Sequence, residues 1–321
     1  MKKTYFFITI FIFFIIFAII ISPQNYIAAF SQGLNTWAKI LLPTIFPLIF
    51  FTKLLTDLGS LNAVSNKMGF TQKLWRAPPI SAYAFMVSIL SGYPVGAKVV
   101  SDLYSDGFIS KHDAIKMCTF TSNSGPMFIY GSVGVGMLFS QTVGLIMLIS
   151  HILSAVLNGI FYRNYKPFNQ SETSFSLNIK PQFSLSSSMT DSILSILLIG
   201  GFVSIFFVVI ELINQIGLFI PLSSFLSGIF NCDSQIFMGL FNGIIEMTHG
   251  CLDITSLNLP LGITAVICTG LITFGGIATM LQAFAFLQKI GISFRFFLTQ
   301  KITQTIFACM ICALLVLVLQ I

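Results

Sequence analysis

Six residues whose types suit ligand binding occupy two polar interruptions between apolar segments. They are Gly92, Tyr93 and Pro94 in the first interruption, and Asn123, Ser124 and Gly125 in the second. Glycine permits close approach of the backbone to a ligand, and proline fits the first turn of a new helix. Serine or glycine can cap a helix N-terminus, whose free N–H groups can donate to carbonyl, hydroxyl or anionic groups. We therefore expect these residues to bind part of a solute; the plainer alternative is a pair of well-capped hairpin turns.

A second set of polar residues lies in the last third of the chain. Asn242, Glu246 and His249 are spaced i, i+4 and i+7, which predicts one shared helix face. An ionisable side chain inside an apolar segment costs about 2.5–3.5 kcal/mol on insertion scales and marks a candidate functional site. Glu246 is therefore the leading single residue; the alternative is a glutamate hydrated at a helix end. Thr279 and Gln282 are expected to complete the substrate site.

The composition indicates an integral membrane protein. Hydrophobic residues make up 55% of the 321 residues and charged residues only 8%, against about 25% charged in average soluble domains. The net charge of +6 is dispersed among apolar segments, so it marks membrane topology rather than a nucleic-acid surface. The six cysteines form no disulfide ladder, and common hydrolase and metalloprotease motifs are missing from the sequence. We predict no enzyme activity, no metal, no cofactor and no nucleic-acid partner.

Residues 1–163 are predicted to form a first membrane repeat. Lys2 and Lys3 precede the apolar run 5–21, which indicates an uncleaved helix with a cytoplasmic N-terminus. The other expected elements are a loop over 22–35, a kinked span over 37–55, an interfacial helix over 61–75, a re-entrant hairpin over 80–123, and crossings over 126–139 and 143–162.

Residues 164–188 are predicted to be a polar cytoplasmic linker, and residues 189–321 a second repeat of opposite topology. No Lys or Arg occurs between Lys180 and Lys289, so the loops between them are expected outside. The expected elements are a crossing over 192–212, an interfacial stretch over 216–230, a hairpin over 234–275 with breaks at 248–251 and 275–276, and a final crossing over 302–319. The predicted fold is an all-α polytopic membrane protein with two inverted-topology repeats, about six full transmembrane helices and two interrupted hairpins.

The run from Ser91 to Lys98, Ser-Gly-Tyr-Pro-Val-Gly-Ala-Lys, together with Asn-Ser-Gly-Pro over 123–126, resembles the YlbJ family of sporulation integral membrane proteins. That family is grouped with the nucleoside recognition, or Gate, proteins. The resemblance is specific over 82–136 and extends to 239–276. It implies that the two hairpins are gates facing a substrate, but it identifies no solute and carries over no sodium site.

We therefore expect a transporter or permease of the bacterial cell membrane, with a small polar solute and the lipid bilayer as its partners. A nucleoside-like solute is the class that the resemblance implies, and the oligomeric state is left open. The alternative is a non-transporting membrane factor that supports assembly of the spore envelope or cortex.

Overall fold

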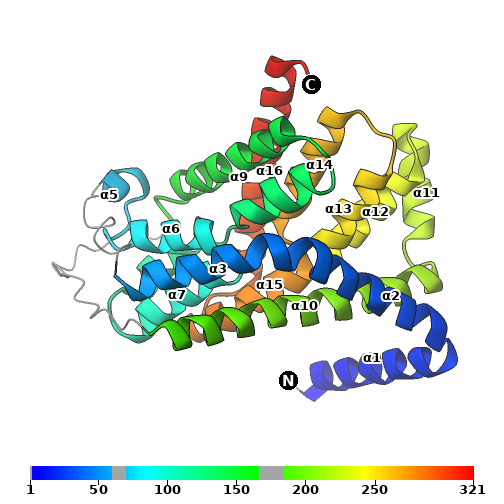
Figure 1. The fold of residues 1–321 in the computed structure, drawn as a ribbon, viewed down its shortest axis with the longest axis horizontal. Helices are drawn as coiled ribbons and strands as arrows, with labels where there is room; N and C mark the ends of the chain where they lie inside the picture. Colours follow the sequence, from blue (N-terminus) through cyan, green and yellow to red (C-terminus); the bar gives the residue numbers. More distant parts are fainter. Residues whose placement is uncertain (1, 60–69, 166–183) are drawn as a thin grey trace.

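The computed structural model describes residues 2–59, 70–165 and 184–321 (Figure 1). These ranges are almost entirely helical, and no β-strand occurs in them. The helices long and apolar enough to cross a membrane, by length and composition, are Pro23–Leu55, Gln141–Phe161, Leu185–Ile216, Leu261–Ile290 and Phe294–Leu319. The prediction of an all-α polytopic membrane protein is confirmed, with five such helices in the described ranges.

The first half opens with α1 and a long helix of three joined parts. In order, its elements are α1 (Lys2–Ile21), α2 (Pro23–Thr36), the π-helical η1 (Trp37–Leu41), α3 (Leu42–Asp57), α5 (Phe70–Trp75), α6 (Ser81–Ser91), α7 (Val95–Ser105), α8 (Lys111–Met117), the π-helical η2 (Met127–Val135) and α9 (Gln141–Phe161).

Two expectations for the first half are wrong. The loop expected over 22–35 is helical, because Pro23 occupies the first turn of α2, where a missing N–H costs nothing. Gly33 does not end this helix; it packs against α10, where a β-carbon on Gly33 would lie 2.8 Å from Ser204 Cα. The crossing expected over 126–139 is the nine-residue η2, which is too short to span a bilayer.

The second half repeats this order of elements. They are α10 (Leu185–Ile216), α11 (Ile220–Phe230), α12 (Ser234–Ile245), α13 (Met247–Ser256), α14 (Leu261–Phe274), α15 (Gly276–Leu287), the 3₁₀ helix η3 (Gln288–Ile290) and α16 (Phe294–Leu319). In each half a helix pair with a sharp break precedes a second broken helix and then a long helix, α9 or α16. The opposite membrane orientation of the halves stays a prediction.

Two boundaries in the second half differ from expectation because serine caps set them. Ser184 accepts a hydrogen bond from Ser187 N, so α10 begins within the predicted linker, whose residues 166–183 lie outside the described ranges. Ser293 accepts from Phe296 N, so α16 begins at Phe294 rather than at 302. The earlier start places Lys301 inside a membrane-length helix.

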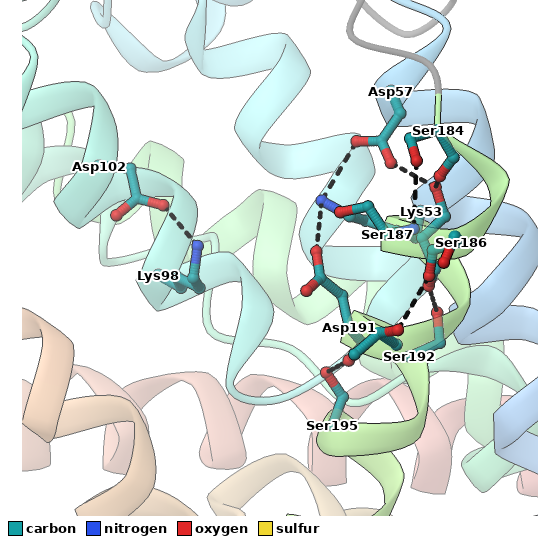
Figure 2. A network of polar contacts seen from close by, with 12 residues as sticks. Lys53, Asp57, Lys98, Asp102, Ser184, Ser186, Ser187, Asp191, Ser192 and Ser195 are labelled. Atoms are coloured by element: carbon teal, nitrogen blue, oxygen red, sulfur yellow. Dashed lines mark hydrogen bonds and ion pairs between the residues drawn. The ribbon is translucent and has the colours of Figure 1, made fainter.

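Long helices from both halves pack together at the centre and at one end of the bundle. Helix α9 lies beside α16, and α10 runs along α2 and α3 (Figure 1). At the end where α3 stops and α10 begins, Lys53 Nζ lies 3.1 Å from Asp57 and 3.3 Å from Asp191 (Figure 2). Ser188 donates to Asp57 at 2.6 Å. This cluster ties the first half to the second.

Candidate functional site

Four helix breaks from distant parts of the chain meet inside the bundle. They are the turn between α6 and α7, segment 121–126 between α8 and η2, Glu246 between α12 and α13, and Gly275 between α14 and α15. Residues of all four broken elements line one cavity of about 60 Å³. Backbone that leaves the helix at membrane depth is tolerated only where protein or a cavity covers it, so the cavity accounts for the breaks.

Glycines allow the breaks to touch. Gly92 has a φ of 74°, and a β-carbon there would lie 2.7 Å from the backbone N of Gly125. A β-carbon on Gly275 would lie 3.4 Å from the ring of Tyr93, which joins a break of the second half to one of the first. The Gly92 position therefore requires glycine both for its conformation and for its contact.

The cavity has one polar side and one apolar side. The predicted site residues that line it are Gly92, Tyr93, Ser124, Gly125, Glu246, Thr279 and Gln282. The apolar wall comes from α3 and α10, with Ile45, Ile49 and Phe202 among its side chains. Within the described part of the chain, the side chains of Ser124, Thr279 and Gln282 make no hydrogen bond to another residue. These three groups are available to a solute.

Glu246 is the break between α12 and α13 rather than part of a continuous helix. Its backbone is extended, with φ −141° and ψ 116°, and its carboxylate accepts from Thr248 N at 3.0 Å and His249 N at 2.7 Å. The break expected at 248–251 is therefore wrong, because the carboxylate caps the N–H groups that begin α13. Glu246 is only 2% exposed. A carboxylate offers about four acceptor positions, so it retains capacity for a solute donor.

Four residues named from the sequence do not line the cavity, namely Asn242, His249, Pro94 and Asn123. Asn242 donates to Asp253 Oδ2 at 2.8 Å, and His249 Nδ1 lies 3.1 Å from the same oxygen. The shared helix face expected for Asn242, Glu246 and His249 is wrong, since the break at Glu246 separates them. Pro94 is the N-cap residue of α7.

Asn123 connects segment 121–126 to two other elements, α6 and α16. Its amide nitrogen donates to Ser88 Oγ at 2.9 Å, and its amide oxygen accepts from Gln304 Nε2 at 3.0 Å. Asn123 is 1% exposed. Its side chain therefore positions the break beside the cavity rather than facing the cavity.

His151, on α9, was missed by the sequence reasoning. Ser124 N donates to His151 Nε2 at 3.0 Å, and His151 Nδ1 lies 2.9 Å from Thr273 Oγ1. Because Nε2 accepts, the proton belongs on Nδ1 and is donated to Thr273, which gives a neutral imidazole. His151 thus joins the second break to α14. Its position in the middle of an apolar helix was the available signal, since ionisable residues there are functional candidates.

Lys301, on α16, was also missed. Its ammonium donates to Tyr93 OH at 2.6 Å, to the Ser122 carbonyl at 3.0 Å and to Gln304 Oε1 at 3.1 Å. The residue is fully buried. It lies directly behind the cavity, whose lining includes Tyr93.

The chain is similar to the sporulation integral membrane protein YlbJ of Bacillus subtilis (strain 168). The two are 25% identical over 330 residues, covering 95% of this chain and 81% of that protein. No protein-family model matches the chain, and no solved structure does. The expected resemblance to YlbJ is thus confirmed along almost the whole chain, while the wider Gate grouping stays a prediction.

Proposed function

We propose that this YlbJ-like chain is a transporter of the bacterial cell membrane that binds a small polar solute where its helix breaks meet. The name of its Bacillus relative supports a role in sporulation. Two halves with the same order of broken helices suit a carrier in which one half moves against the other around a central site. The N-terminus is assigned to the cytoplasm from Lys2 and Lys3.

The observation that carries the proposal is a set of unused polar groups on a buried cavity. Ser124, Thr279 and Gln282 offer two hydroxyls and an amide, and Glu246 offers a carboxylate. Buried polar groups are normally paired within the protein. Because these groups are left available around one cavity, they favour a solute that has hydrogen-bond donors. The apolar wall favours a solute whose other face, toward α3 and α10, is apolar.

The cavity volume shows what movement the proposed function requires. At about 60 Å³ the cavity holds a few water molecules, whereas sites for drug-sized ligands measure about 300–1,000 Å³. A nucleoside-like solute therefore requires the apolar wall to move away from the broken helices.

A thermal-stability screen of the purified protein tests the proposal. Nucleosides, nucleobases, amines and carboxylic acids are added to the wild type and to the Glu246→Gln, Ser124→Ala and Ser195→Ala variants. Ser195 is half-buried on α10, outside the cavity lining, and among the described residues its hydroxyl bonds only to Asp191 O in its own helix, so it is the matched control. A solute at 100 times its Kd should stabilise the wild type and the control by about 2.7 kcal/mol. Both cavity variants should respond less.

Solutes that stabilise all four proteins equally would show binding elsewhere and contradict the site. A confirmed solute should then enter vesicles that contain the wild type but not those with Ser124→Ala. If no solute binds and both cavity variants support normal sporulation in place of the relative, the non-transporting assembly role replaces the transporter proposal.

A further inference from the structure

Lys301 is a buried lysine on α16. It is 0% exposed, and no carboxylate of the described ranges lies within ion-pair distance of its Nζ. An unpaired buried ammonium is costly unless its hydrogen bonds are satisfied. The protein must therefore provide a dedicated set of oxygen atoms for this group.

Those oxygens come from three separate elements. Tyr93 belongs to the turn between α6 and α7, Ser122 contributes a carbonyl of segment 121–126, and Gln304 lies one turn along α16. The ammonium also lies 4.9 Å from the Tyr93 ring centroid. An ammonium has three N–H donors, and all three are used. Lys301 therefore has no donor left for a solute.

Neighbouring groups orient these oxygens toward the ammonium. The Tyr93 hydroxyl donates its own proton to Thr273 O at 3.1 Å, so it presents a lone pair to Lys301. Gln304 donates its amide nitrogen to Asn123, so its oxygen faces Lys301. The Ser122 carbonyl is available because residues 121–125 are not helical. The result is a preformed shell of hydroxyl, carbonyl and amide oxygens.

We propose that this shell is a monovalent-cation site that the Lys301 ammonium fills permanently. Oxygen atoms of these types are the ligands of hard cations, and carbonyls of unwound helices coordinate coupling ions in transporters. The tethered ammonium takes the place of an exchangeable ion. Shortening the side chain empties the shell and opens it to Na⁺ or K⁺. If the chain is a transporter, as proposed above, it follows that solute movement needs no alkali cation. The cation site itself does not depend on the proposed function.

Thermal melting of the full-length protein in detergent tests this site without any solute. Wild type, Lys301→Ala and Lys301→Met are compared in NaCl, KCl and choline chloride at equal ionic strength. Lys301→Ala should melt below the wild type in choline, and Na⁺ or K⁺ should raise its melting temperature in a saturable manner. A cation at ten times its Kd shifts the folding equilibrium about tenfold. Lys301→Met fills the space with an uncharged chain and should not respond, and neither should the wild type.

A second substitution links the response to the shell. Adding Tyr93→Phe to Lys301→Ala removes one oxygen and should raise the cation concentration needed for half of the stabilisation. The proposal is overturned if Lys301→Ala melts equally in all three salts, if neither NaCl nor KCl yields folded Lys301→Ala, or if the wild type itself is stabilised by Na⁺ or K⁺ over choline.

Discussion

Replacing Gly92 by alanine tests whether the first two helix breaks touch as described. Gly92 and Gly107 have nearly the same φ, 74° and 77°, but a β-carbon on Gly107 meets no atom within 4 Å. Alanine at either position must take a positive φ, and at Gly92, where ψ is −168°, the backbone conformation is one that essentially only glycine adopts, at a cost of about 1–3 kcal/mol. At Gly92 the new carbon also lies 2.7 Å from Gly125 N and 3.1 Å from Gly125 Cα. These are backbone atoms that cannot rotate away, so overpacking adds about 1–3 kcal/mol.

The quantity to compare is the difference between the two variants, because Gly107→Ala has the cost of a positive φ without a close contact of the new carbon. Each kcal/mol lowers the melting temperature of a chain of this size by about 2 °C. Gly92→Ala should therefore melt about 2–6 °C below Gly107→Ala in the same detergent. Equal melting temperatures would refute the close contact between the turn and segment 121–126, and with it the meeting of the breaks.

Two further predictions concern helix packing and the tie between the halves. A β-carbon on Gly250 would lie 2.2 Å from Gly243 Cα, so Gly250→Ala should destabilise the protein by about 1–3 kcal/mol in a denaturation assay. Gly201→Ala, which meets open space, is the control, and an equal loss would contradict the packing of α13 on α12. Lys53→Ala should speed amide hydrogen exchange in the first turns of α10 while changing stability by less than about 1 kcal/mol. Lys98→Ala removes an exposed pair within α7 and should leave α10 exchange unchanged; equal exchange in both would show that Lys53 does not hold α10.

The breaks that glycine and proline cause could be predicted from sequence, whereas the one at Glu246 could be located only to within a few residues. Gly92 and Gly275 end their helices where expected, since both need a backbone conformation that favours glycine. The chain from Ile244 to His249 contains neither glycine nor proline. The break in this stretch depends on the Glu246 carboxylate, which caps the next helix in the folded protein. Helix propensities of the individual residues do not predict such an interaction.

Some site residues could likewise be predicted from the sequence, and others could not. Glu246 was recognisable as a charge within an apolar run, and the structure places it at the cavity. Lys301 lies shortly after Arg295 in sequence, just outside the final crossing predicted over 302–319. Its burial follows from the earlier start of α16 and from contacts with Tyr93 and Ser122, which are more than 170 residues away along the chain. Contacts of that range have no signature in a single sequence.

The dependence of segment 121–126 on α16 has a consequence for biosynthesis. The Ser122 carbonyl and the side-chain oxygen of Asn123 find partners in Lys301 and Gln304, which the ribosome adds some 180 residues later. Until then the first half enters the membrane with these groups unpaired, a state that hydrocarbon penalises. The nascent first half therefore needs water, lipid headgroups or an insertion factor at this segment until α16 arrives. A premature stop codon ahead of α16 would disable both halves of the protein.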